Sequence, residues 1–158
     1  MELINVGAIN LVIPGNFPIS CIPIYLTAFH NDHPALYDEN KCLRCFNDFT
    51  MYHNRQLQLA IQELKKEFPQ VLIIYADYYK TLMRIINHAL AKGKCKIGGA
   101  YNFNPFSMCG ICSMQGVPVC PNLKKYIHWD SIHLTQEAHR QMAIWLIFNI
   151  AKQWKCLV

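Results

Sequence analysis

Leu57-Gln-Leu-Ala-Ile61-Gln-Glu-Leu64-Lys-Lys-Glu-Phe68-Pro69-Gln-Val71-Leu-Ile-Ile-Tyr-Ala76 is the stretch that decides the fold of this chain. Its first apolar residues recur at i, i+4, i+7 and i+11, the spacing of one helix face, and they are Leu57, Ile61, Leu64 and Phe68. Pro69 ends this helix. The run that follows, residues 71–76, is short and continuously apolar, which predicts a strand covered on both faces.

A second short apolar run lies upstream of this helix. Residues 9–13 are rich in β-branched side chains and end at Pro14-Gly15, which predicts a buried strand that runs into a loop. The segment before it, Met1 to Gly7, is consistent with a short helix closed by Gly7. A strand, a helix and another strand form a βαβ crossover, so we expect the two strands to be parallel neighbours with a right-handed crossover between them. Residues 16–40 have no clear period and are expected to form a loop.

Downstream, the pattern predicts two more helices. One covers about Tyr78–Ala91, and a last helix begins after Thr135, which caps it, with Glu137 in the first turn. Residues 94–126 read as a long loop, and residues 127–129 as a short extended segment. The whole order predicts an α/β domain with a parallel sheet between helices. Because two parallel strands rarely stand alone, we expect the first strands of the sheet to lie before Met1, leaving one edge bare.

Composition narrows the possible functions. The chain has 158 residues, of which 53% are hydrophobic and 16% charged, so it can build one core. The net charge of +5 is scattered, without the basic run that binds nucleic acid. We expect no membrane span, because the longest apolar stretches are too short, and no signal peptide in this chain. Eight cysteines are more typical of an oxidising compartment than of the cytosol.

The residues best suited to chemistry are Asp130 and His133. They lie three residues apart just ahead of a helix cap, so the carboxylate can fold back onto the imidazole. A carboxylate in that place fixes the ring tautomer and stabilises the imidazolium, which is what a general base needs. The alternative is a helix-entry loop in which both side chains only cap. The other six histidines have no recognisable partner. Asp77 lies at the end of the second predicted strand, where a loop begins and aspartates are common.

Two blocks around these features resemble the GDSL-type lipases and esterases, also called SGNH hydrolases. Trp129-Asp130-x-x-His133-x-Thr135 is similar to their C-terminal W-D-x-x-H-x-T motif. The segment from Pro14 to Cys21 resembles the P-x-N-x-P-x-G-C block of plant members, among them acetylajmalan- and sinapine-esterase-like proteins, with Ser20 in place of the glycine. The resemblance runs from about Gly7 to Leu146.

The resemblance implies a flavodoxin-like, three-layer α/β fold, with residues 1–158 as the C-terminal part of a single hydrolase domain. In this family a serine in a Gly-Asp-Ser-Leu motif is the nucleophile, and a Gly and an Asn complete the oxyanion hole. None of these three blocks occurs in the sequence. Only the Asp130 and His133 roles are therefore carried over. The four serines, which lie outside any strand-to-helix turn of that kind, are Ser20, Ser107, Ser113 and Ser131.

By family, the chain is expected to act on small-molecule esters, to use no cofactor or metal and to be secreted. Alone it should be inactive, and an inactive remnant is one alternative; the oligomeric state is unknown. The other alternative is a zinc or redox module built on the two CxxC pairs, Cys42/Cys45 and Cys109/Cys112. Their separation exceeds that of usual zinc ribbons, so disulfides of undetermined connectivity are the simpler expectation.

Overall fold

A pair of parallel strands forms the centre of the molecule. The computed structural model describes residues 2–91, 126–130 and 132–154. Within them, β1 (Asn10–Pro14) pairs in parallel with β2 (Leu72–Ala76), and Asn10 lies opposite Leu72. The predicted pairing of the two apolar runs is confirmed, with each strand beginning one residue later than expected. The prediction that the first strand is buried is wrong, because the residues of β1 alternate between exposed and half-buried. Two neighbouring parallel strands with a helix between them in the chain also agree with the predicted α/β class.

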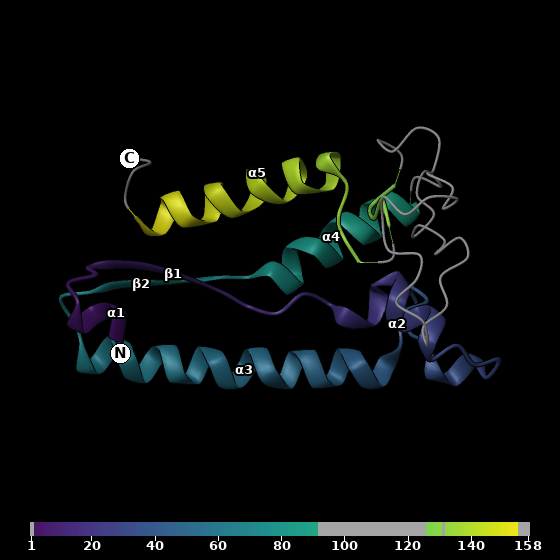
Figure 1. Ribbon diagram of the computed structural model, residues 1–158, viewed down its shortest axis with the longest axis horizontal. Coiled ribbons are helices and arrows are strands. Elements are labelled where there is room, and N and C mark those ends of the chain that lie inside the picture. Colours follow the sequence, from purple (N-terminus) through teal and green to yellow (C-terminus); the bar gives the residue numbers. More distant parts are fainter. Residues whose placement is uncertain (1, 92–125, 131, 155–158) are drawn as a thin grey trace.

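Helices cover the strand pair on both faces, so the chain forms three layers (Figure 1). The helix α3 (Arg44–Glu67) runs along one face, whereas α5 (Gln136–Gln153) lies on the other and packs on β2. The helix α4 (Tyr78–Ala91) follows β2 directly and packs on α5. Its bounds are those predicted from the sequence. The layers agree with the α/β/α arrangement that the resemblance implies.

The described residues form two hydrophobic cores, and one of them includes residues of both strands. Ile61 of α3 packs with Val71 and Ile73, and the partly buried Leu11 and Ile13 of β1 join them. On the other side, a larger cluster joins the two C-terminal helices to the segment that precedes α5. Its buried members are Cys21, Cys42, Leu82, Ile85, Ile86, Ile127, Leu134, Ala138 and Met142. The residues around Asp130 are thus anchored in this second core.

The long helix was only half predicted. The apolar spacing placed its start near Leu57, but α3 begins at Arg44. Its first half buries polar side chains, Asn47, Thr50 and Asn54, in place of apolar ones. Asn54 shows why: its Oδ1 accepts from the backbone N–H of Asn16 at 2.7 Å, and its Nδ2 donates to the Asn16 carbonyl at 3.0 Å. A helix that buries amides against a loop has no apolar period to detect.

The loop between β1 and α3 contains structure that its composition did not predict. It holds the short helix α2 (Pro23–Ala28) and two single turns, η1 (Ile19–Cys21) and η2 (Pro34–Leu36). A disulfide between Cys21 and Cys42 closes the loop. The Asp38 carboxylate accepts from the backbone N–H of Cys42 at 2.9 Å, which fixes the turn leading into α3. One disulfide and local hydrogen bonds, rather than a periodic apolar pattern, organise this region.

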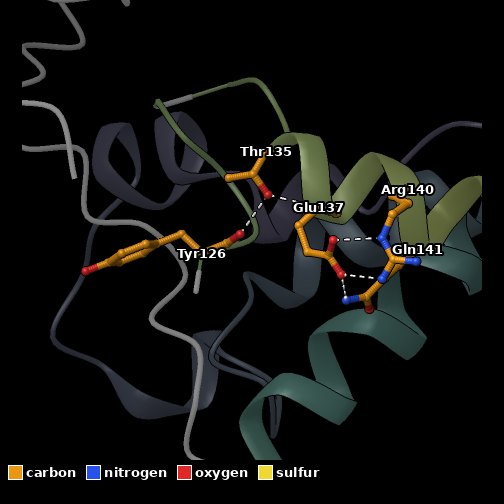
Figure 2. A network of polar contacts seen from close by, with 6 residues as sticks. Tyr126, Thr135, Glu137, Arg140 and Gln141 are labelled. Atoms are coloured by element: carbon orange, nitrogen blue, oxygen red, sulfur yellow. Dashed lines mark hydrogen bonds and ion pairs between the residues drawn. The ribbon is translucent and has the colours of Figure 1, made fainter. Parts of the chain in front are cut away.

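A tight hairpin leads into α5. Its two arms meet through an antiparallel bridge between His128 and Leu134, and the Thr135 N–H donates to the Ile127 carbonyl at 2.8 Å. The predicted cap of α5 is confirmed: Thr135 Oγ1 accepts from the Ala138 N–H at 3.2 Å. The same hydroxyl donates to the Tyr126 carbonyl at 2.8 Å (Figure 2). One threonine therefore ties the base of the hairpin to the first turn of the helix.

The predicted N-terminal helix is present as α1 (Glu2–Asn5), and Gly7 closes it with a φ of +99°. The long loop predicted for residues 94–126 lies outside the described residues, apart from Tyr126. Across the described ranges, none of the helices combines the length and the apolar character needed to cross a bilayer.

His128 gives the hairpin a pH-dependent stability. It is buried, its Nδ1 lacks a hydrogen-bond partner among the described residues, and burial lowers its pKa from 6.5 to about 4 while nearby Asp130 acts in the opposite direction. Above pH 6.5 the ring is neutral in both folded and unfolded chains. Below it the unfolded chain takes up a proton that the folded chain resists, so stability falls as pH drops from about 6.5 to about 4.

As the pH falls from about 6.5 to about 4, we expect the buried His128 to lower the free energy of unfolding by about 3 kcal/mol. Nuclear magnetic resonance titration of the ring protons should give a midpoint near 4 for His128. Replacing it, as His128→Asn, should flatten the pH dependence between 4 and 6.5, whereas His139→Asn, at an exposed site on α5, should not. A midpoint near 6.5 in the folded protein would contradict the assignment.

The disulfide should contribute about 2–4 kcal/mol to stability, because it closes a loop with a sequence separation of 21 residues. Urea denaturation of Cys21→Ala/Cys42→Ala should show this loss, and reduction of the unaltered protein should reproduce it. Cys45→Ser is the matched control, since Cys45 is free and exposed. Equal unfolding midpoints for the reduced and oxidised protein would show that the bond adds nothing.

Thr135→Ala should lower the free energy of unfolding by about 1–2 kcal/mol, because the helix loses its cap and the Tyr126 carbonyl loses its donor. Thr135→Ser keeps the hydroxyl and should lose less than half as much. A chemical denaturation series of the three proteins measures both values, and an equal loss in the two variants would refute a role for the hydroxyl.

Candidate active site

Asp130 and His133 form a hydrogen-bonded pair at the tip of the hairpin. The His133 Nδ1 donates to the Asp130 Oδ2 at 2.6 Å. The Asp130 side chain is only 7% exposed, whereas that of His133 is 55% exposed. The sequence-based prediction that the carboxylate reaches the ring is confirmed. The acid is thus sheltered and the base is open to solvent.

The loop backbone holds the carboxylate in place. The Asp130 Oδ1 accepts from the N–H of Ile132 at 2.7 Å and from the N–H of His133 at 2.5 Å. The hairpin closes below this turn, where the Trp129 N–H donates to the His133 carbonyl at 3.1 Å. The Trp129 ring lies 6.1 Å from the His133 ring, centroid to centroid. Spacing alone predicted the pair, but not that the backbone fixes the acid.

This geometry specifies the chemistry available to His133. A carboxylate can only accept, so Nδ1 carries the proton and Nε2 is left with its lone pair. Nε2 can therefore take a proton from a hydroxyl group or a water molecule, and Asp130 would stabilise the resulting imidazolium. Thr135, rather than either of these side chains, provides the N-cap of α5, whereas Asp130 accepts hydrogen bonds within the loop before it.

Among the described residues, no serine is positioned to receive the action of this base. Ser20 is fully buried, and its hydroxyl donates to Asn47 Oδ1 at 2.5 Å. Asn47 in turn donates to Asp38 Oδ2 at 2.7 Å, so Ser20 belongs to a network that secures the loop. Its burial removes it as a candidate nucleophile. The other three serines, Ser107, Ser113 and Ser131, lie outside the described residues.

The other candidate residues either stabilise the fold or lie at the surface. Asp77 caps α4, since its Oδ1 accepts from the Lys80 N–H at 2.9 Å. Of the six other histidines, His128 is buried in the hairpin, and five are exposed: His30, His33, His53, His88 and His139. A groove of about 660 Å³ between α4 and α5 is lined by Asp77, Arg84 and Trp145 among others, but neither Asp130 nor His133 lines it.

The cysteines do not support the zinc or redox alternative. Cys42 is bonded to Cys21 and so is not paired with Cys45, as the CxxC reading required. A disulfide sulfur is not a thiolate, so Cys42 is lost as a metal ligand. Over the described ranges, no group of three or more His, Cys, Asp or Glu side chains is arranged to hold a metal ion. Cys109 and Cys112 lie outside those ranges.

Known proteins resemble the chain over nearly all its length. A GDSL esterase/lipase of Arabidopsis thaliana is 46% identical over 98% of this chain and 49% of its own length. Acetylajmalan esterase 2 of Rauvolfia serpentina is 41% identical over 98% of the chain, and sinapine esterase of Brassica napus 36% over 99%. The chain covers 43% and 44% of these two proteins, so it spans about half the length of the curated relatives it matches. None of the solved structures matches it.

The family model gives the same result independently. The model of GDSL-like lipases and acylhydrolases matches residues 2–146, a range that includes both strands, the hairpin and most of α5. The Asp130–His133 pair falls inside this match. The chain therefore belongs to the GDSL-like lipase/acylhydrolase family.

Proposed function

We propose that this chain supplies the acid–base half of a serine ester hydrolase. His133 acts as the general base, and Asp130 orients its ring and stabilises its charge. The observation that carries the proposal is the 2.6 Å contact between a sheltered carboxylate and an open imidazole.

The reaction assigned to the pair is acyl transfer followed by hydrolysis. His133 Nε2 removes the proton of a serine hydroxyl as its oxygen attacks the ester carbonyl, and then gives that proton to the leaving alcohol. A water molecule, activated by the same nitrogen, then releases the acid and restores the serine. We place the serine and the oxyanion-hole donors in the part of a GDSL-family chain that this chain does not span.

The substrate class we propose is a small-molecule ester. Two of the relatives are named as esterases of acetylajmalan and sinapine, which supports the class without fixing the acid or the alcohol. We also propose that the protein works in an oxidising, extracellular compartment. The disulfide between Cys21 and Cys42 supports this, since such bonds persist in secreted proteins.

By itself the chain should not hydrolyse p-nitrophenyl acetate faster than free imidazole at the same concentration. A positioned base contributes only about 10²–10⁴-fold, and each missing oxyanion donor removes about 10²–10³-fold. Fusing the chain to the unmatched half of the Arabidopsis thaliana relative should create esterase activity. His133→Ala should lower the kcat of that fusion by at least about 10²-fold.

His139→Ala is the matched control, because His139 is an exposed histidine on α5 whose loss should leave kcat unchanged. Asp130→Asn should lower kcat while leaving KM close to its original value, since the amide cannot stabilise the imidazolium. Burst kinetics from the chain alone, with stoichiometric labelling by an organophosphate, would refute the proposal that its nucleophile lies elsewhere. An inactive fusion that folds normally would instead favour a non-catalytic remnant.

A further inference from the structure

A groove of about 660 Å³ lies between α4 and α5, which pack on each other. The end of β2 contributes Tyr75 and Ala76 to its lining, and both helices contribute side chains along their length. Its volume suits a small molecule, since the sites that bind such molecules measure about 300–1,000 Å³. Neither Asp130 nor His133 lines it, so the groove is separate from the hydrogen-bonded pair of the candidate active site.

Positive charge predominates in the described lining of this groove. Lys80 and Arg84 are four residues apart on α4, so their cationic groups lie on the same face of the helix and repel each other. Neither forms an ion pair with another described residue. The one carboxylate in the described lining belongs to Asp77, whose Oδ1 accepts from the Lys80 backbone N–H at 2.9 Å and so caps α4. An anion bound near the two cations would relieve their repulsion.

The Arg84 guanidinium is held against the Trp145 ring, with its Cζ 3.6 Å from the ring centroid. This cation–π contact joins α4 to α5 and limits the rotation of the arginine side chain. It uses the flat face of the guanidinium, so the N–H groups around the edge remain available. Two of these N–H groups can donate to the two oxygens of one carboxylate. The tryptophan thus positions a cation that has no acidic partner among the described residues.

We propose that the groove between α4 and α5 binds a small carboxylic acid with an apolar body. Arg84 and Lys80 hold the carboxylate, and the apolar body lies along Trp145 and the other apolar side chains of the lining, which are Met83, Leu146, Phe148 and Ile150. A bare inorganic anion would leave these apolar side chains unused, and a neutral apolar molecule would leave the two cations without a partner. An acid that combines a charge with an apolar body satisfies both parts of the groove.

The test is a calorimetric titration of the complete 158-residue chain with hydrocinnamate at neutral pH and low salt. The chain should bind one molecule of the acid, about tenfold more tightly than hydrocinnamide, which has a similar shape without the charge. Arg84→Gln should abolish this preference, because glutamine carries no charge. Asp77→Asn should tighten acid binding by about twofold or more, since it removes a negative charge from the groove while an asparagine still caps α4.

Arg55→Gln is the matched control, since Arg55 is an exposed arginine of α3 that does not line the groove. Both arginines are exposed, so neither change should unfold the chain, and melting curves check this. Equal affinity for the acid and the amide, equal weakening by the two glutamine variants, or no binding would overturn the proposal. Inorganic phosphate that displaces the acid at an equal concentration would also overturn it, because the apolar body would then add nothing. No ester is present, so the result does not depend on the proposed function.

Discussion

The parallel pairing of β1 with β2 is the constraint on which the rest of the structure depends. Parallel strands cannot be joined by a tight turn, so the chain between them has to cross over one face of the pair. The helix α3 makes this crossing, and its Ile61 packs with Ile73 of β2. The opposite face then needs its own cover, which α5 provides where it packs on β2, and α4 packs in turn on α5. Three layers follow from one strand pair.

The candidate site is a consequence of how that second face is covered. The hairpin before α5 is anchored by Ile127 and Leu134 in the core and by Thr135 at the helix start. Its tip is therefore held while remaining at the surface. Backbone N–H groups in the tip fix the Asp130 carboxylate, and the carboxylate fixes His133. The hydrogen bonds that arrange the tip therefore join residues that are close together in the chain.

Two surfaces of this architecture are uncovered among the described residues. Helices cover both faces of β2, but β1 keeps an uncovered edge among the described residues, and α5 carries apolar side chains on the side away from its core. Both features are unusual for a finished surface, because exposed strand edges and apolar stripes favour association. The relatives in which these elements occur are about twice as long.

The sequence by itself determined the strands, the helix α4, the cap at Thr135 and the Asp130–His133 pair. Each of these depends on residues that are close in the chain: an apolar run, a helical period, a capping side chain, and an acid three residues before a histidine. Tertiary structure alone decided the first half of α3, the pairing of Cys21 with Cys42 and the burial of Ser20. These depend on contacts between distant segments, such as Asn54 with Asn16 and Ser20 with Asn47, and a buried polar side chain has no periodic signature in a sequence.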